Sequence, residues 1–277
     1  MMSKLTPEDV VLRYSKRGMN ILKKYLKDGY CRTAAEKLLH AERGTDLLTT
    51  GFYVAGYAET DGPLGTVAVA EALNQLGFHS VVVTDKYCKG FFELKQLDVE
   101  YVDIAADEQV YEDILDKYHP VYMISIERCG ENAEHEYANM RGVSITSETA
   151  AIDHLFELAP EKHIPTIGVG DGGNEIGMGN VKDIISEKLE LNPCVVPVDD
   201  LIIATTSNWG AYALTAWLQK LSGEEVLFTF AEAEPYLAAT LEIGSVDGVL
   251  KEKKMGVDGF DMTVEKEILD SLAEAIA

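Results

Sequence analysis

The sequence predicts an α/β fold, a mostly parallel, doubly wound, Rossmann-like sheet with helices on both faces. Three observations support this prediction. Short apolar runs rich in β-branched residues alternate with helical segments along most of the chain. Successive βαβ units of this length place their strands in parallel. The chain has 277 residues, 47% of them hydrophobic, which is enough to bury a sizeable core.

The domain organisation follows from the same pattern. We expect a single catalytic domain over residues 1–277, with an N-terminal helical layer at 1–43 and an α/β core with C-terminal helices at 44–277. Thr6 suits an N-cap and Pro7 the first helical position, so a helix is predicted from there to about Lys27. A second helix is predicted at 31–42. The basic residues of the first helix, Arg17 among them, are interpreted as a solvated face.

The remaining elements are expected in alternating order. Strands are predicted at 46–55, 79–84, 99–104, 121–126, 164–169 and 200–205. Helices are predicted at 66–76, 86–96, 107–118, 147–158, 181–189, 211–221 and 232–243, with a last one from 263. Ser207 or Asn208 would cap the helix at 211–221.

A glycine-rich stretch after the strand at 164–169 dominates the sequence. Residues 168–180 hold five glycines after the strand, together with Asp171, Glu175 and two asparagines. Glycine at this density excludes an ordinary helix and lets the backbone approach a ligand closely. Open α/β sheets bind ligands at the carboxyl ends of their strands, so this loop predicts a binding site.

Polar loops follow three other predicted strands as well. They contain Asp61, Glu127 with Arg128, and Ser207 with Asn208. A doubly wound sheet would bring all four loops to one edge. Crowded carboxylates repel one another unless a proton or cation neutralises them. Oxygen ligands favour Mg²⁺ or Mn²⁺. The predicted metal ligands are Asp61, Glu127, Asp171 and Glu175.

Composition excludes several classes of protein. The formal net charge of −23 argues against nucleic-acid and anionic-membrane partners, while an anionic small molecule would need a local cationic or metal patch. No apolar run reaches the roughly 18 residues that a membrane span needs. The four cysteines show no metal or disulfide spacing, which fits a reducing, cytoplasmic setting. A lone cysteine such as Cys129 is more often a buried hydrophobe than a nucleophile.

The segment Gly168 to Gly173 formally matches the G-x-G-x-x-G dinucleotide fingerprint. That fingerprint normally belongs to the first βα turn and opens directly into a helix. Here it lies late in the chain and Gly177 and Gly179 follow, so we expect no nucleotide cofactor. The sequence also lacks a P-loop ending and a G-x-S-x-G elbow.

Several motifs stand out along the chain. They are Thr60-Asp61-Gly62-Pro63, Ser125-Ile126-Glu127-Arg128, Asn139-Met140-Arg141-Gly142, the stretch 168–179 and Ser207-Asn208-Trp209-Gly210. Together they resemble the catalytic C-terminal domain of the D-glutamate cyclase family. The similarity spans about residues 45–220, and its most specific part is the glycine stretch. It implies an α/β sandwich that converts D-glutamate to 5-oxo-D-proline with loss of water.

That reaction requires a base for the substrate amine and activation of the γ-carboxylate by a proton or a Lewis acid. We expect Asp171 or Glu127 to act as base, with Asp61 and Glu175 as proton donor or metal ligand. Arg128 or Arg141 would clamp the α-carboxylate. The further predicted substrate-binding residues are Asn139, Gly62, Gly172, Gly173, Asn174, Ser207 and Asn208.

Two other functions fit the same residues. One is a metal-dependent hydrolase of a small phosphorylated metabolite, and the other is a non-catalytic small-molecule sensor. A homo-oligomer is left open by the sequence.

Overall fold

A six-stranded, all-parallel sheet forms the centre of the molecule. The computed structural model describes residues 5–277. The strand order is β5-β4-β1-β6-β7-β8, and every neighbouring pair is parallel. The strands are β1 (Thr45–Thr50), β4 (His79–Thr84), β5 (Asp98–Tyr101), β6 (Tyr122–Ile126), β7 (Thr166–Gly170) and β8 (Asp200–Ile203). The predicted fold class is confirmed.

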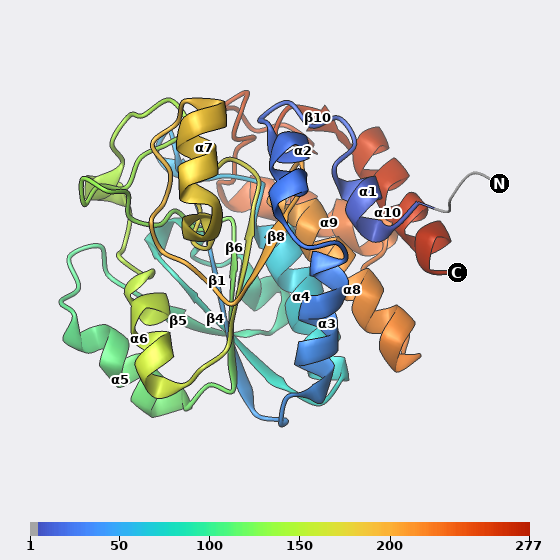
Figure 1. The fold of residues 1–277 in the computed structure, drawn as a ribbon, viewed down its shortest axis with the longest axis horizontal. Helices are drawn as coiled ribbons and strands as arrows, with labels where there is room; N and C mark the ends of the chain where they lie inside the picture. Colours follow the sequence, from blue (N-terminus) through green and yellow to red (C-terminus); the bar gives the residue numbers. More distant parts are fainter. Residues whose placement is uncertain (1–4) are drawn as a thin grey trace.

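Helices cover both faces of this sheet (Figure 1). On one face, α4 contacts β1, β4 and β6, α8 contacts β6, β7 and β8, and α3 packs on α8. On the other face, α5 and α6 lie side by side. The bounds are α3 (Tyr30–His40), α4 (Pro63–Gln75), α5 (Gln109–Tyr118), α6 (His154–Lys162), α7 (Lys182–Leu189) and α8 (Ser207–Ser222).

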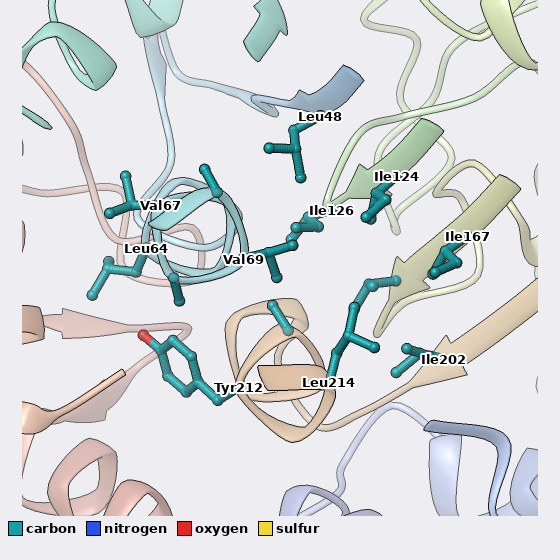
Figure 2. Close-up of a cluster of buried hydrophobic side chains, with 14 of the residues drawn as sticks. Leu48, Leu64, Val67, Val69, Ile124, Ile126, Ile167, Ile202, Tyr212 and Leu214 are labelled. Atoms are coloured by element: carbon teal, nitrogen blue, oxygen red, sulfur yellow. The ribbon is translucent and has the colours of Figure 1, made fainter. Parts of the chain in front are cut away.

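Aliphatic side chains from α4 and α8 fill the space against the sheet (Figure 2). In Figure 2, Val69 on α4 lies beside Ile126, Leu214 on α8 points toward the sheet, and all three side chains are fully buried. Burying such a side chain stabilises the fold by about 1.5–3 kcal/mol relative to leaving it exposed. The packing fixes the N-termini of α4 and α8 next to each other at the carboxyl edge of the sheet.

The first and last helices of the described chain pack together beside α8. Here α1 (Pro7–Val11) contacts both α8 and α10 (Met262–Ile276), and α10 also contacts α9 (Phe230–Ile243). The predicted N-cap Thr6 is confirmed, and it forms a capping box with Asp9. No helix within residues 5–277 combines the length and apolar character of a membrane span.

The long first helix predicted to about Lys27 is wrong. After α1 the chain turns, then forms α2 (Met19–Leu22) and a short 3₁₀ helix (Lys23–Tyr25). Tyr14 and Gly18 have φ of 61° and 87°, values that a continuous helix does not allow. The turn points Arg17 toward the carboxyl edge of the sheet.

Three other predicted elements also need correction. The helix at 86–96 is two 3₁₀ segments, Lys86–Cys88 and Phe92–Lys95, separated by Gly90 at φ 90°. The helix at 147–158 begins only at His154, after a 3₁₀ turn at Thr146–Glu148. The strand at 46–55 stops at Thr50, since Gly51 has φ of 101° and the chain continues as a hairpin of β2 (Tyr53–Val54) and β3 (Tyr57–Ala58).

Two short strands, β9 (Gly256–Val257) and β10 (Phe260–Asp261), form a second hairpin before α10. The loop between these two strands carries Asp258, which belongs to the candidate site.

The N-cap of α8 is Thr206 rather than Ser207 or Asn208, because the Thr206 side chain accepts a hydrogen bond from the Trp209 N–H.

Candidate active site

The glycine-rich loop after β7 closes on its own glutamate. The Glu175 carboxylate accepts backbone N–H groups from Asp171 at 3.3 Å, Gly172 at 2.7 Å and Gly173 at 2.7 Å. A Cβ on Gly172 would lie 2.7 Å from Glu175 Oε1, which explains glycine at that position. The close approach that this glycine allows is to a carboxylate of the loop itself, and the predicted approach of the backbone to a ligand stays a prediction.

Asp61 and Asn208 cap each other's helices. Both oxygens of Asp61 accept backbone N–H groups at the start of α8, from Ser207 and Asn208, each at 2.8 Å. Asn208 Oδ1 in turn accepts from Gly62 at 2.9 Å and Gly65 at 2.7 Å, at the start of α4. This exchange satisfies N–H groups that a helix start leaves free, and it joins two loops far apart in the sequence.

These loops bring buried carboxylates together. Oxygens of Asp61, Asp171 and Asp258 lie within 4.8 Å of one another, and so do oxygens of Glu127, Asp171 and Glu175. Glu59 is also buried at this edge, with 6% of its surface exposed. We call Glu59, Asp61, Glu127, Asp171, Glu175 and Asp258 the acidic cluster.

Arg17 is the cation paired with the acidic cluster. Its Nη1 atom lies 2.7 Å and 2.6 Å from the two oxygens of Asp171. The same atom lies 2.8 Å from Asp258 Oδ2. Within residues 5–277 no other side chain forms an ion pair with the cluster. Negative charge therefore exceeds positive charge in a region with little water to screen it.

This imbalance shifts the acid–base behaviour of the cluster. Burial, reinforced by neighbouring Asp171 and Glu175, raises the pKa of Glu127 well above its ordinary value. Burial and Asp258 raise the pKa of Asp61 to about 8. Burial likewise raises the pKa of Asp171, even though Arg17 opposes that rise. Carboxyl groups of this kind can hold a proton near neutral pH, as general acids must.

A cavity of about 430 Å³ opens onto the cluster. Two of the clustered acids, Glu59 and Glu127, face it, and so does Arg17. The other polar lining residues are Asn139, Arg141, Ser144, Asn174 and Lys251, and the apolar lining includes Phe52, Tyr53, Val54, Val143, Ile145 and Val249. The cavity thus combines acids and cations within an apolar wall, as small-molecule sites do.

The predicted site residues divide into two groups. Glu127, Asn139, Arg141 and Asn174 line the cavity. The second group has its polar groups engaged within the protein and consists of Asp61, Gly62, Arg128, Asp171, Gly172, Gly173, Glu175, Ser207 and Asn208. This second group shapes the site from behind the cavity wall.

Arg128 illustrates the second group. It is fully buried, and its Nη1 donates to Asp85 at 2.6 Å and to the Gly51 carbonyl at 2.8 Å. Its Nη2 donates to the Ala150 carbonyl at 2.6 Å. The guanidinium therefore ties together the loops after β1, β4 and β6. Cys129, next to it, is buried too, and burial raises the pKa of its thiol, which favours a structural role.

Sequence reasoning missed Arg17, Asp258 and the cavity role of Glu59. Arg17 was grouped with neighbouring basic residues as solvated, and that interpretation is wrong. No local pattern distinguished it, because its partner Asp171 lies 154 positions away. Asp258 sits in a hairpin loop of φ 52° that resembles an ordinary turn. Glu59 lies two positions before Asp61 in the same polar loop, so its place in the sequence was a signal for a role at the site.

Comparison with known proteins identifies the family of the chain. A family model described as D-glutamate cyclase-like, C-terminal, matches residues 8–273. The chain is 31% identical to the human mitochondrial D-glutamate cyclase, over 80% of this chain and 40% of that protein. It therefore spans less than half the length of this relative.

Among solved structures, a UDP-glucose 4-epimerase from Brucella ovis in complex with NAD is 14% identical, with a TM-score of 0.34 over 53% of this chain and 49% of that chain. An aldohexose dehydrogenase from Thermoplasma acidophilum is 12% identical, with a TM-score of 0.29 over 85% and 88%. Both structures share too little of the fold with this chain to indicate its family. By these matches, the chain belongs to the D-glutamate cyclase-like C-terminal family.

Proposed function

We propose that the protein is a hydro-lyase that cyclises D-glutamate to 5-oxo-D-proline in the cavity over the acidic cluster. The observation that carries the proposal is that Glu59 and Glu127 both face this cavity, beside Arg17 and Arg141. Family membership supports the reaction class. The cavity offers carboxylates for an amine and cations for the two carboxylates of the substrate.

The two cavity carboxylates would act as an acid–base pair. One of them, ionised, accepts a proton from the substrate ammonium group. The freed amine attacks the γ-carboxyl carbon and the C–N bond forms. The other carboxyl group, protonated, donates its proton to one γ-oxygen and then takes a second proton from the nitrogen. The first carboxyl group passes its proton to the same oxygen, the C–O bond breaks and water leaves, so that both groups regain their starting states. Neighbouring carboxyl groups that cannot all ionise together supply both protonation states at one pH.

Glu127 is the stronger candidate for the base. Its Oε2 accepts a hydrogen bond from the Ser207 hydroxyl, which fixes the carboxylate against the start of α8. Its place directly after β6, with φ of 49°, turns the side chain over the edge of the sheet. Asp171, the other predicted base, is fully buried behind Arg17 and does not line the cavity. In the proposal Asp171 holds Arg17 in place.

Arg141 would bind the α-carboxylate. Asn139 Oδ1 accepts from the backbone N–H of Arg141 at 2.9 Å, and this turn presents Arg141 at the cavity. Its guanidinium forms no ion pair with the part of the chain that the structure describes, so it is free for a ligand. Holding a flexible substrate in a folded conformation favours ring closure, since positioning alone contributes several kcal/mol.

The donor set also fits a divalent cation. Asp61, Glu127, Asp171, Glu175 and Asp258 offer hard oxygen ligands, and their negative charge exceeds that of Arg17. Mg²⁺ or Mn²⁺ held there would polarise the γ-carboxyl group of the substrate. The residues named above would still bind and orient the substrate and move its protons.

The test is direct. Wild-type protein is incubated with D-glutamate and with L-glutamate, with and without Mg²⁺ or Mn²⁺, and ring formation is followed by ¹H NMR. We expect 5-oxoproline from the D-enantiomer. No ring formation from either enantiomer, or turnover only of phosphate esters included in parallel, would refute the proposal.

A further inference from the structure

The cavity has a hydrophobic side that the cyclisation of D-glutamate does not use. A small hydrophobic cluster, separate from the main core, consists of buried Phe52, Cys129, Tyr137 and Ile145, with Tyr53 and Val54 packed against them. Four of these residues line the cavity, and we call Phe52, Tyr53, Val54 and Ile145 the hydrophobic wall. Glutamate has only two methylene groups between its charged ends, so it covers little of this wall.

The hydrophobic wall adjoins the two cavity acids. The backbone N–H of Glu59 donates to the Phe52 carbonyl at 3.1 Å, which places this acid beside the wall. Glu127 lies two positions before Cys129, a buried member of the same hydrophobic cluster. A ligand group that packs on the wall is therefore close to the acids that would act on the γ-carbon.

The cavity is also larger than glutamate. Its volume is about 430 Å³. Glutamate has ten non-hydrogen atoms; ten water molecules would occupy about 300 Å³ at roughly 30 Å³ each, and ten bonded atoms occupy less. At least about 130 Å³ therefore stays free beside a bound glutamate, which is room for a further group attached to it.

Lys251 is a cation without a partner at the mouth of the cavity. The fully buried Asp247 accepts backbone N–H groups from Val249 at 2.9 Å, Leu250 at 2.7 Å and Gly259 at 2.8 Å. The loop held in this way presents Val249 and Lys251 to the cavity. Within residues 5–277 the Lys251 ammonium group forms no hydrogen bond or ion pair. An apolar residue next to a free cation suits a ligand with an apolar group and a carboxylate.

We propose that the site also accepts γ-D-glutamyl amides of apolar amino acids, and that it closes the same ring with release of the amino acid. The D-glutamyl part binds at Glu59, Glu127 and Arg141. The apolar side chain of the leaving amino acid packs on the hydrophobic wall and Val249, and its carboxylate pairs with Lys251. This deepens the proposed function and rests on it for the ring closure and the acid–base pair.

The reaction balances without a further reactant. The substrate ammonium group gives one proton to the ionised carboxylate, and the freed amine attacks the γ-amide carbon to form the C–N bond of the ring. The protonated carboxyl group donates to the amide nitrogen, the old C–N bond breaks, and the ring nitrogen returns a proton to that group. The released amine takes the proton that the first group holds. An amide is uncharged, so it accepts the attack more readily than a carboxylate does.

The first test compares kcat/KM for D-glutamate, its γ-methylamide and its γ-butylamide, followed by ¹H NMR with protein-free samples as a correction for spontaneous ring closure. We expect the butylamide to exceed the methylamide by roughly fourfold for each methylene group that reaches the hydrophobic wall, up to about 60-fold. Equal values for the two amides would overturn the role of the wall. No release of amine from either would overturn the proposal.

A matched pair of variants examines the mouth of the cavity. Val249 and Leu250 are adjacent and have 47% and 40% of their surfaces exposed, but only Val249 lines the cavity. Val249→Asn should reduce the preference for the butylamide over the methylamide about 2- to 4-fold, which corresponds to one methylene group, and Leu250→Asn should keep it. The same preference in both variants would contradict the assigned position of the leaving group.

Lys251 is tested with γ-D-glutamyl-leucine, which carries the carboxylate that the butylamide lacks. Lys251→Gln should lower kcat/KM for γ-D-glutamyl-leucine relative to the butylamide roughly 3- to 10-fold, as expected for the loss of one hydrogen-bonded partner. Lys253→Gln is the control, because Lys253 is an exposed lysine two positions later that does not line the cavity. An unchanged ratio in folded Lys251→Gln would overturn this pairing.

These outcomes separate the inference from the proposed function. Turnover of D-glutamate without release of amine from any of the amides would overturn the inference alone. Formation of 5-oxo-D-proline from the amides and none from D-glutamate would overturn the loss of water from D-glutamate and leave the inference standing.

Discussion

Two buried charged regions lie at the same edge of the sheet, and they differ in how their charge is balanced. Arg128 and Asp85 form a one-to-one pair, and the Gly51 and Ala150 carbonyls accept further hydrogen bonds from Nη1 and Nη2. The acidic cluster has six carboxyl groups and pairs with Arg17 only, within residues 5–277. The first region is balanced in charge without a ligand, whereas the second gains from protons, a cation or a substrate. The balance of charge therefore distinguishes the Arg128–Asp85 pair, which holds loops together, from the acidic cluster, which we propose acts on a ligand.

The largest expected effect breaks the balanced region. Asp85→Asn leaves the Arg128 guanidinium buried without its counter-ion, and we expect the free energy of unfolding to fall by about 3–5 kcal/mol. Urea denaturation followed by circular dichroism measures this. A loss below 1 kcal/mol would mean that the pair contributes little and that the comparison between the two regions fails.

A smaller effect is expected from Asp46, a buried acid outside both regions. It lies near the start of β1, accepts from Ser80 at 3.1 Å, and its second oxygen is unpartnered. Burial raises its pKa to about 7 from an ordinary 3.8. The folded protein therefore binds this proton more tightly than the unfolded chain, and its stabilising effect is lost as pH rises from 4 to 7.

Asp46→Asn removes that dependence. Relative to wild type, the variant should gain about 2 kcal/mol of stability between pH 5 and pH 7, at 1.36 kcal/mol per unit of pKa shift. Denaturation curves at the two pH values provide the measurement. A constant difference between variant and wild type would show that burial does not control this group. Turnover should be unchanged, which distinguishes a buried acid from a catalytic one.

The smallest expected effect concerns the reciprocal caps. Asn208→Ala removes the acceptor for two N–H groups at the start of α4, and loss of such a cap costs about 1–2 kcal/mol. The same denaturation experiment measures it. Wild-type stability in this variant would mean that water replaces the cap fully.

The sheet and the glycine loop were predictable because their signals are local. The β-branched runs at 79–84 and 121–126 gave the strands nearly to the residue, and the density of glycine marked the loop after β7. Helix breaks at Gly18 and Gly90 were not predicted, since an isolated glycine is compatible with a helix at a cost of about 1 kcal/mol.

The pairing of charges was beyond the sequence for a different reason. Arg17 and Arg128 look alike in sequence, yet one reaches the cavity and the other is closed off by carbonyls. Which of the two faces the cavity depends on a turn before α2 and on the crossing of three loops. Such long-range contacts depend on the fold, and no local sequence pattern around Arg17 or Arg128 predicts them.

The most direct test of the account compares turnover of D-glutamate by Glu127→Gln and Glu136→Gln. Glu127 faces the cavity, whereas Glu136 is an exposed acid nine positions later. With both variants folded, we expect Glu127→Gln to lose roughly 10²- to 10⁴-fold in rate, the usual contribution of a general base, and Glu136→Gln to match wild type. Near-normal turnover by Glu127→Gln would contradict the assignment of this acidic cluster as the active site.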